Sequence, residues 1–182
     1  MRVVLLGPPG SGKGTQAAML SARLGLPSIS TGALLRAALD REPASDLGLA
    51  AARILSGELV DDTTANGLVA SAVDSGDFLI DGYPRTVEQA GWLTRRLSDC
   101  GLSLDAAVQL VVPSEVVLGR LRARGRADDD IAAVARRLEV HAERSGPVER
   151  YYADRGELRV IDGTGLPDAV HARICEALAL AV

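Results

Sequence analysis

The feature that most constrains this chain is a glycine-rich segment, Gly7 to Thr15, that directly follows the apolar run Val3 to Leu6. It contains Lys13, the only lysine of the chain, whereas the other nineteen lysine-or-arginine positions are arginine. A glycine loop between a strand and a helix aims backbone N–H groups at one point, and a flexible ammonium can follow a moving phosphate. An ordinary glycine-rich turn is the alternative, but a cation at a helix N-terminus is unfavourable unless an anion binds there. The spacing G-x-x-x-x-G-K therefore predicts a phosphate-binding loop.

Composition excludes several classes of protein. The length of 182 residues fits one domain, and a hydrophobic fraction of 47% is enough for a real core. A net charge of −4 disfavours nucleic acid and anionic membranes as partners. The two cysteines, Cys100 and Cys175, lie far apart and lack the spacing of metal ligands. The sequence shows no signal peptide and no apolar run of about 20 residues, so we expect a cytoplasmic protein. We also expect a monomer, and ligands that are small anions.

Short apolar runs alternate with amphipathic stretches, a pattern typical of a parallel sheet covered by helices. We therefore predict an α/β fold with a five-stranded parallel sheet, helices on both faces, and ligands at the carboxyl ends of the strands. Two regions depart from the alternation: the helical patterns of residues 31–60 and the polar stretch 122–130. Both are candidate flaps within one domain, 1–182. The predicted strands are residues 2–6, 27–29, 78–80, 106–112 and 158–161, and helical patterns cover 86–97 and 114–124.

Polar residues follow the second and third predicted strands. Thr31, with Arg36 about one helical turn further on, could hold a second phosphate, although a capped helix with a solvated arginine would look the same. Asp81 ends an apolar strand as a Walker-B carboxylate does, where it can hold Mg²⁺ through water. Gly82 and Pro84 shape a turn that presents Arg85, and the amide of Gln89 could pair with a base edge. The alternative there is a structural turn with exposed polar residues.

Arginines are concentrated between residues 120 and 137 of an otherwise acidic chain. Such clustering is self-repulsive on a solvated helix, and a polyphosphate would relieve the repulsion when a flap closes. A simple exposed helix and nucleic-acid binding are the alternatives, and the second lacks interleaved aromatic residues. The cluster consists of Arg120, Arg122, Arg124, Arg126, Arg136 and Arg137.

Together these residues resemble the adenylate kinase family over nearly the whole chain. The matching signatures are G-P-P-G-S-G-K-G-T, I-S-T-G-x-x-x-R, G-E-L-V, D-G-Y-P-R-x-x-x-Q, R-G-R-x-D-D and R-R-L. The resemblance implies a P-loop fold with an AMP-binding insertion at 30–60 and a short lid at 123–133. It also implies reversible phosphoryl transfer from Mg-ATP to AMP, giving two ADP, with Mg²⁺ as cofactor and no zinc in the short, cysteine-free lid. Two alternatives stay open: a UMP/CMP kinase and a nucleotide-binding regulator with weakened catalysis. Thr31 and Gln89 favour AMP over the pyrimidine nucleotides.

The resemblance also assigns roles to residues. It places ATP on Gly10, Ser11, Gly12, Lys13, Gly14, Thr15, Arg120, Arg124 and Gly165. It places AMP on Thr31, Arg36, Glu58, Leu59, Val60, Gly82, Tyr83, Pro84, Arg85, Gln89, Arg126 and Arg137. The catalytic residues would be Lys13, Arg85, Arg124, Arg126 and Arg137. Asp81 would hold Mg²⁺ through water.

One position departs from the family pattern. The family usually has Asp or Glu where Ala33 stands, a carboxylate that helps order water around Mg²⁺. The transfer itself needs no dedicated base, because a phosphate monoester is already mostly ionised at pH 7. We therefore expect both histidines, His141 and His171, to be surface or packing residues.

Overall fold

The structure is a computed structural model that describes residues 1–55, 58–125 and 131–180. Within these residues it has five strands and eight helices. The strands are β1 (Arg2–Leu6), β2 (Ser28–Ser30), β3 (Phe78–Asp81), β4 (Ala106–Val111) and β5 (Leu158–Asp162). The helices are α1 (Lys13–Leu24), α2 (Thr31–Arg41), α3 (Asp46–Leu55), α4 (Asp62–Ser75), α5 (Val87–Asp99), α6 (Ser114–Arg124), α7 (Ile131–Asp154) and α8 (Pro167–Ala177).

All five strands form one parallel sheet in the order β2-β3-β1-β4-β5. The predicted α/β fold is thus confirmed, with strand ends that differ by one residue. Strands β2, β3 and β5 each end on a polar residue: Ser30, Asp81 and Asp162, respectively. They extend this far because hydrogen bonds between strands join backbone groups and do not require an apolar side chain. In the sheet register Asp81 lies beside both Leu5 and Ser30. The polar ends of neighbouring strands therefore meet at one edge.

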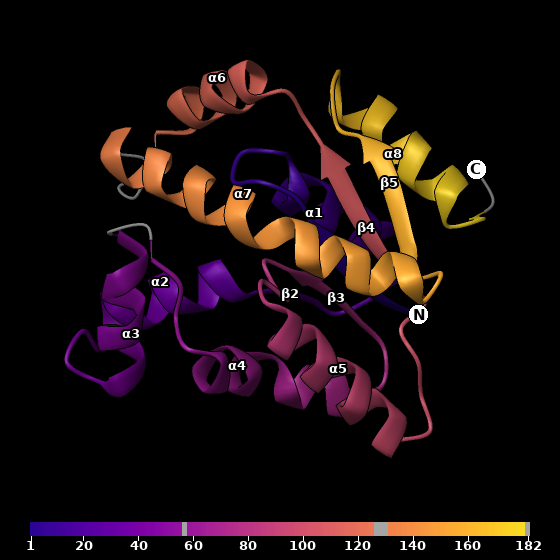
Figure 1. Cartoon of the computed structure of the whole chain (residues 1–182), viewed down its shortest axis with the longest axis horizontal. Coiled ribbons are helices and arrows are strands. Elements are labelled where there is room, and N and C mark those ends of the chain that lie inside the picture. Colours follow the sequence, from indigo (N-terminus) through magenta and orange to yellow (C-terminus); the bar gives the residue numbers. More distant parts are fainter. Residues whose placement is uncertain (56–57, 126–130, 181–182) are drawn as a thin grey trace.

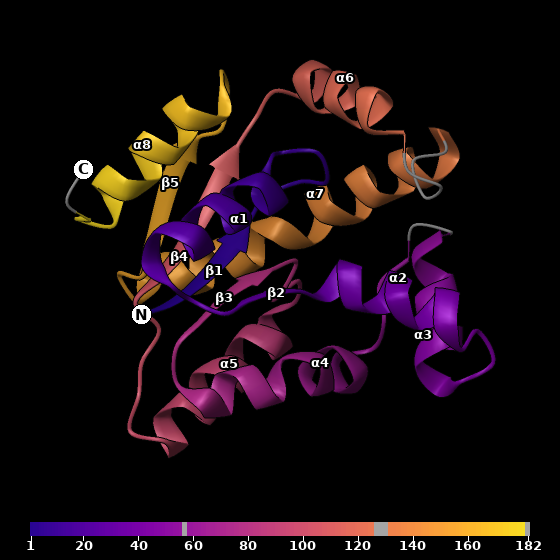
Figure 2. The same cartoon turned by 180° about the vertical axis from the view of Figure 1, so that it is seen from behind.

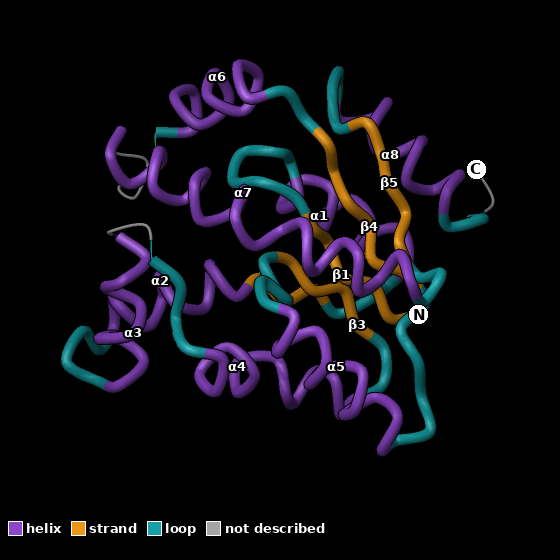
Figure 3. Tube along the Cα trace, viewed as in Figure 1, coloured by secondary structure: helices purple, strands orange, loops and turns teal. Residues whose placement is uncertain are grey.

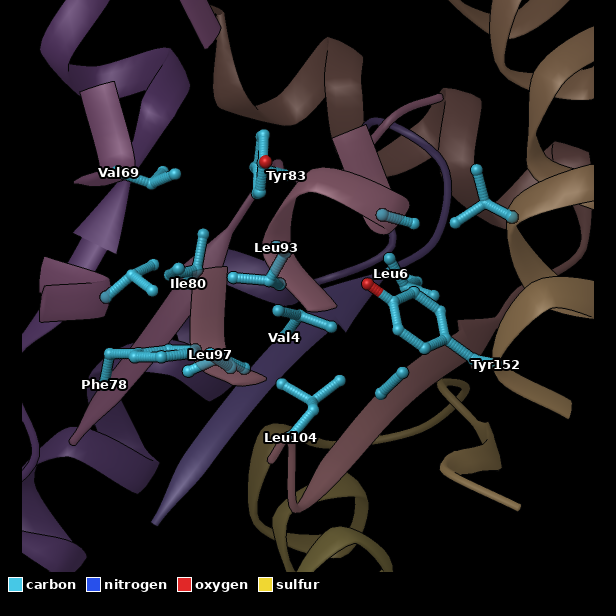
Figure 4. Close-up of a cluster of buried hydrophobic side chains, with 14 of the residues drawn as sticks. Val4, Leu6, Val69, Phe78, Ile80, Tyr83, Leu93, Leu97, Leu104 and Tyr152 are labelled. Atoms are coloured by element: carbon cyan, nitrogen blue, oxygen red, sulfur yellow. The ribbon is translucent and has the colours of Figure 1, made fainter. Parts of the chain in front are cut away.

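Helices cover both faces of the sheet, which explains why the central strands are apolar throughout. Side chains alternate between the faces of a strand, so Val4 points to one face and Leu5 to the other. The first face packs against α4, α5 and α7, and includes Tyr152 (Figure 4). The second packs against α1 and α8, which lie behind the sheet in Figure 1 and in front of it in Figure 2. No helix of the described residues is long and apolar enough to span a membrane.

The helices α2 and α3 project from the carboxyl-end side of the sheet, beyond β2 (Figure 3). Helix α2 begins where β2 ends, and its N-cap Ser30 accepts a hydrogen bond from Ala33 N at 3.4 Å. Leu49 of α3 is 59% exposed, so this region carries apolar surface away from the main core. The helix α6 and the first turns of α7 lie at the same end of the molecule (Figure 1). The helical pattern predicted for residues 31–60 agrees with α2 and α3, and the flap role of this region stays a prediction.

Candidate functional site

The carboxyl ends of the strands open into one large cavity of about 1090 Å³, called the central cavity below. Its lining comes from the loop after β1, the start of α2, the turn after β3, α6, α7 and the loop after β5. Segments that lie far apart in the sequence thus share one site. Of the residues with predicted binding roles, the lining includes Gly10 to Thr15, Arg36, Glu58, Leu59, Gly82, Pro84, Arg85, Arg120, Arg124, Arg137 and Gly165, and it also includes Asp81.

The glycine-rich loop wraps around the N-terminus of α1. Gly12 is the N-cap of this helix, with left-handed backbone and no side chain to satisfy the first N–H groups, and the first turn holds no acidic residue. These N–H groups are therefore left for an anion. Gly10 has φ of 81°, and a Cβ there would lie 2.8 Å from Leu121 Cγ. Only glycine lets the loop approach α6 this closely.

Lys13 lies at the centre of this loop. Its Nζ donates hydrogen bonds to the carbonyl oxygens of Gly7 at 2.8 Å and Pro8 at 2.9 Å. Burial lowers the Lys13 pKa to about 8; Asp81 partly opposes this, and Arg85 and Arg124 add to the lowering. The ammonium is thus held by neutral carbonyls beside other cations, an arrangement that a bound polyanion would relieve.

Asp81 stands next to the start of α1. An ideal Cβ on Gly14 would lie 3.6 Å from Asp81 Oδ2, which places the carboxylate against the first turn of the helix. Described residues hold no cluster of three or more His, Cys, Asp or Glu side chains. One carboxylate near a phosphate-binding loop fits Mg²⁺, which keeps several waters and takes its other ligands from substrate phosphates. The residues present therefore suit a nucleotide-bound magnesium ion.

Arg85 is presented by the turn after β3. Its Nε donates to the carbonyl of Gly82 at 2.8 Å. Gly82 has φ of 87°, and a Cβ there would lie 2.8 Å from Thr31 Oγ1. The Arg85 side chain is exposed to the solvent of the cavity. Desolvation by the surrounding protein lowers the pKa of Arg85; the charge of Asp81 opposes this shift, and the charges of Arg137 and Arg36 add to it. The turn thus aims a guanidinium at the same region as Lys13.

Four predicted AMP-binding residues do not line the central cavity: Thr31, Val60, Tyr83 and Gln89. Gln89 is only 2% exposed; its Oε1 accepts from Arg85 N at 2.7 Å and its Nε2 donates to Asp62 Oδ1 at 2.8 Å. In the present arrangement Gln89 fixes the Arg85 turn rather than facing the cavity. Thr31 is 5% exposed, and its Oγ1 lies 3.4 Å from the carbonyl of Asp81. A contact from either side chain to a base would need a local rearrangement.

Arg120 joins two loops across the cavity. One guanidinium nitrogen donates to Ser11 O at 3.1 Å, and the other lies 3.0 Å from Gly163 O and 3.4 Å from Gly165 O. The loop after β1 and the loop after β5 are therefore held at a fixed separation. Because these bonds lie in the guanidinium plane, the flat faces can still stack on an aromatic ring.

Cations outnumber carboxylates in the described lining. Three carboxylates face the cavity, those of Glu58, Asp81 and Glu149. Arg126 and residues 127–130 of the predicted lid, 123–133, lie outside the described residues. Such an excess of positive charge in a chain of net charge −4 indicates a polyanionic ligand. The seven lining cations are Lys13, Arg36, Arg85, Arg120, Arg124, Arg137 and Arg144.

Sequence reasoning missed several lining residues on α7, among them His141 and Arg144. His141, expected at the surface or in packing, lines the cavity about one turn beyond Arg137, and Arg144 follows a turn later. The signal available was the helical spacing of three and four residues from Arg137, which places all three on one face. His171 lies on α8 near Cys175 Sγ, at 3.5 Å, and is not part of the cavity lining.

Comparisons with known proteins agree with this geometry. A model of the family described as adenylate kinase matches residues 5–157. The chain is 45% identical to an adenylate kinase of Mycobacterium sp. (strain MCS), over 98% of this chain and 99% of that protein. It is 46% identical to one of Xanthomonas campestris pv. campestris (strain 8004) and 44% identical to one of Stenotrophomonas maltophilia (strain R551-3), with the same coverage.

Proposed function

Since this chain belongs to the adenylate kinase family, we propose that its central cavity binds ATP and AMP together and transfers a phosphoryl group between them. The enzyme is an ATP:AMP phosphotransferase, and the products of the forward reaction are two ADP. The observation that supports this site best is the convergence of Lys13, Arg36, Arg85, Arg124 and Arg137 on one cavity. A protein that binds a single nucleotide has no need of so many converging cations.

The two nucleotides would occupy opposite ends of the cavity. ATP phosphates would lie on the loop from Gly10 to Thr15, where backbone N–H groups of α1 are unsatisfied. The ATP base would lie against Arg120 and Gly165, since the guanidinium faces and the nearby backbone are accessible there. AMP phosphate would lie between Arg36 and Arg85, with Glu58 to Val60 and Gly82 to Pro84 around the nucleoside.

The chemistry needs positioning and charge neutralisation rather than a general base. An oxygen of the AMP phosphate forms a bond to the γ-phosphorus of ATP while the bond to the β–γ bridging oxygen breaks. Lys13 can leave the carbonyls of Gly7 and Pro8 and follow the transferred group, because its ammonium has a flexible stem. Arg85, Arg124, Arg126 and Arg137 would stabilise the charge that develops in transfer.

Magnesium supplies charge neutralisation on the β and γ phosphates when it is bound with ATP. Asp81 would hold its water shell from the end of β3, beside Gly14. Ala33 cannot contribute a carboxylate to that shell. We also propose that residues 30–60 and 123–133 close over the nucleotides and exclude water that would otherwise accept the phosphoryl group.

The substrate assignment is tested by measuring ADP formation from Mg-ATP with AMP, CMP, UMP and GMP as acceptors. We expect kcat/KM for AMP to exceed that for each other acceptor by at least about tenfold. A higher kcat/KM for CMP or UMP would overturn the assignment of AMP as acceptor.

The site is tested with paired arginine variants. Arg85→Ala should lower kcat/KM by about 10²- to 10³-fold, because it removes a contact to charge in the transition state. The matched control is Arg95→Ala, since Arg95 is exposed on α5 and outside the cavity lining. The same comparison applies to Arg124, in the lining, and Arg122, which is exposed on the same helix. Equal activity within either pair would contradict the proposed site.

A further inference from the structure

A histidine lies among the phosphate-binding cations of the central cavity. His141 is partly buried on α7, about one helical turn from Arg137 and about one turn from Arg144. No described residue forms a hydrogen bond with its ring. A polar ring that faces a cavity without a protein partner is available to a ligand.

Charged groups from several elements line the same cavity as this ring. The loop after β1 contributes Lys13, and the turn after β3 contributes Asp81 and Arg85. The remaining lining charges are Arg36, Glu58, Arg120, Arg124, Arg137, Arg144 and Glu149. Burial, followed by the charges of Lys13 and Arg85, lowers the His141 pKa to about 4. The ring is therefore neutral at pH 7 in the ligand-free protein.

We propose that His141 is a further phosphate-binding residue of this enzyme, which takes up a proton as the polyphosphate chain fills the cavity and then donates a hydrogen bond to it. The proposal rests on the proposed function, because it needs ATP and AMP phosphates in the central cavity.

The driving force is the loss of the positive potential of the cavity lining when phosphates bind. Without ligand, a protonated His141 would add one more cation to a lining that already holds seven against three carboxylates. Bound phosphates offset this positive charge, and an anion within about 6 Å favours the charged form of histidine. The neutral ring thus avoids repulsion in the empty cavity, and the imidazolium adds attraction once the cavity is filled.

Proton uptake is measurable with a bisubstrate ligand. Diadenosine pentaphosphate joins both nucleosides through five phosphates, none of which ionises near neutral pH, so the ligand itself neither binds nor releases a proton. Titration calorimetry at pH 6 in buffers of different ionisation enthalpy gives the protons taken up on binding. We expect the His141→Gln variant to take up fewer protons on binding than the wild type does, by a substantial part of one proton. The affinity ratio of wild type over His141→Gln should rise about tenfold between pH 8 and pH 5.5, because the complex binds the additional proton.

The other histidine of the chain provides the matched control. His171→Gln should behave as the wild type, since His171 lies on α8 outside the cavity lining. If His141→Gln weakened binding by the same factor at every pH, His141 would only shape the cavity wall and the proposal would be wrong. If the wild type neither bound the dinucleotide nor formed ADP, the proposed function would fail instead.

A second measurement does not depend on the His141 variant. With two histidines in the chain, the ring signals in NMR spectra can be assigned with His171→Gln alone. The His141 ring should titrate at a higher pH in the dinucleotide complex than in the ligand-free protein. An unchanged or lower titration midpoint would overturn the proposal.

Discussion

Lys13 is a residue whose ionisation depends on its burial in the cavity. Its pKa is lowered to about 8, chiefly by burial, so the ammonium that binds phosphate is lost as the pH rises through this value. Because kcat/KM reports ionisations of the unbound enzyme, it should fall about tenfold per pH unit above pH 8. The kcat profile should stay level to higher pH, since bound phosphates stabilise the ammonium. Steady-state rates from pH 6 to 10 test this; a kcat/KM that stays constant to pH 10 contradicts it.

Ala33 is the position at which the sequence resemblance led us to expect a carboxylate. It lines the cavity in the first turn of α2. Ala33→Asp should lower the Mg²⁺ concentration needed for half-maximal activity by several-fold, because a second carboxylate can order the water shell. Ala33→Asn, which has similar size and no charge, should not. Equal magnesium dependence of both variants would mean that other groups order this water.

For single residues, the sequence predicted which residues belong to the site better than it predicted how their side chains are oriented. Lys13, Asp81 and Arg85 were expected at the carboxyl ends of the strands and all three line the cavity, because their motifs depend on local strand-to-turn geometry. Gln89 is predicted to bind a base, and that role stays a prediction; in this structure its amide is bonded to Asp62 and to Arg85 N. Its orientation depends on α4, which is distant in sequence, so no local pattern indicates it. His141 was missed for the same reason, since its position in the cavity depends on how α7 packs.

Two buried tyrosines allow a test of how the helices are held together. Tyr83 Oη lies 2.7 Å from Asn66 Oδ1 on α4 and 3.0 Å from Gln89 O on α5, and its single proton serves both acceptors. Tyr152 Oη, on α7, is buried without a partner among the described residues. Phenylalanine preserves the edge-on contacts of these rings with Trp92 and Tyr151, respectively.

Tyr83→Phe should therefore lower the free energy of unfolding by about 1 to 2 kcal/mol, and Tyr152→Phe should change it by less than about 0.5 kcal/mol. Denaturant unfolding of both variants measures the difference. A larger loss for Tyr152→Phe than for Tyr83→Phe would show that the hydroxyl of Tyr152 has a partner in solution.

The contacts of Arg120 join α6 to the loops after β1 and β5. Arg120→Ala should raise KM for ATP by about tenfold or more and leave KM for AMP nearly unchanged, since it releases the loop that contains Gly165. Arg120→Lys should restore little, because one ammonium cannot donate to both loops with the geometry of a guanidinium. The control is Arg122→Ala on the exposed side of the same helix. Equal increases in both KM values would assign Arg120 to general stability.

Elements were more predictable than their contacts. The apolar runs predicted β1, β3 and β4 most clearly, because central strands buried on both faces of a parallel sheet are rich in Val, Leu and Ile. The edge strands β2 and β5 are more polar and more exposed, and their positions were predicted from shorter apolar runs. Helix α6 has the predicted bounds, Ser114–Arg124, whereas α7 is a single helix of 24 residues that no motif delimited. Pro147 lies inside this helix, and a local rule would have ended it there.

The whole molecule combines an acidic exterior with a cationic cavity. With a net charge of −4, attraction of nucleotides depends on the local excess of seven cations over three carboxylates in the lining. Raising the KCl concentration from about 0.05 to 0.5 M should therefore increase both KM values several-fold through screening. The thermal unfolding midpoint should change little, because the core is apolar. KM values that do not depend on salt would exclude this electrostatic contribution.

The lone lysine also makes the protein chemically simple. Lys13 carries the only primary amine among the side chains, so a reagent that acylates side-chain amines reacts there, through the unprotonated form. A protease that cuts after lysine has one cleavage site in the entire chain, in the loop that wraps the start of α1. Labelling or digestion therefore reports directly on whether that loop is covered, and intact mass spectrometry can read cavity occupancy without an engineered probe.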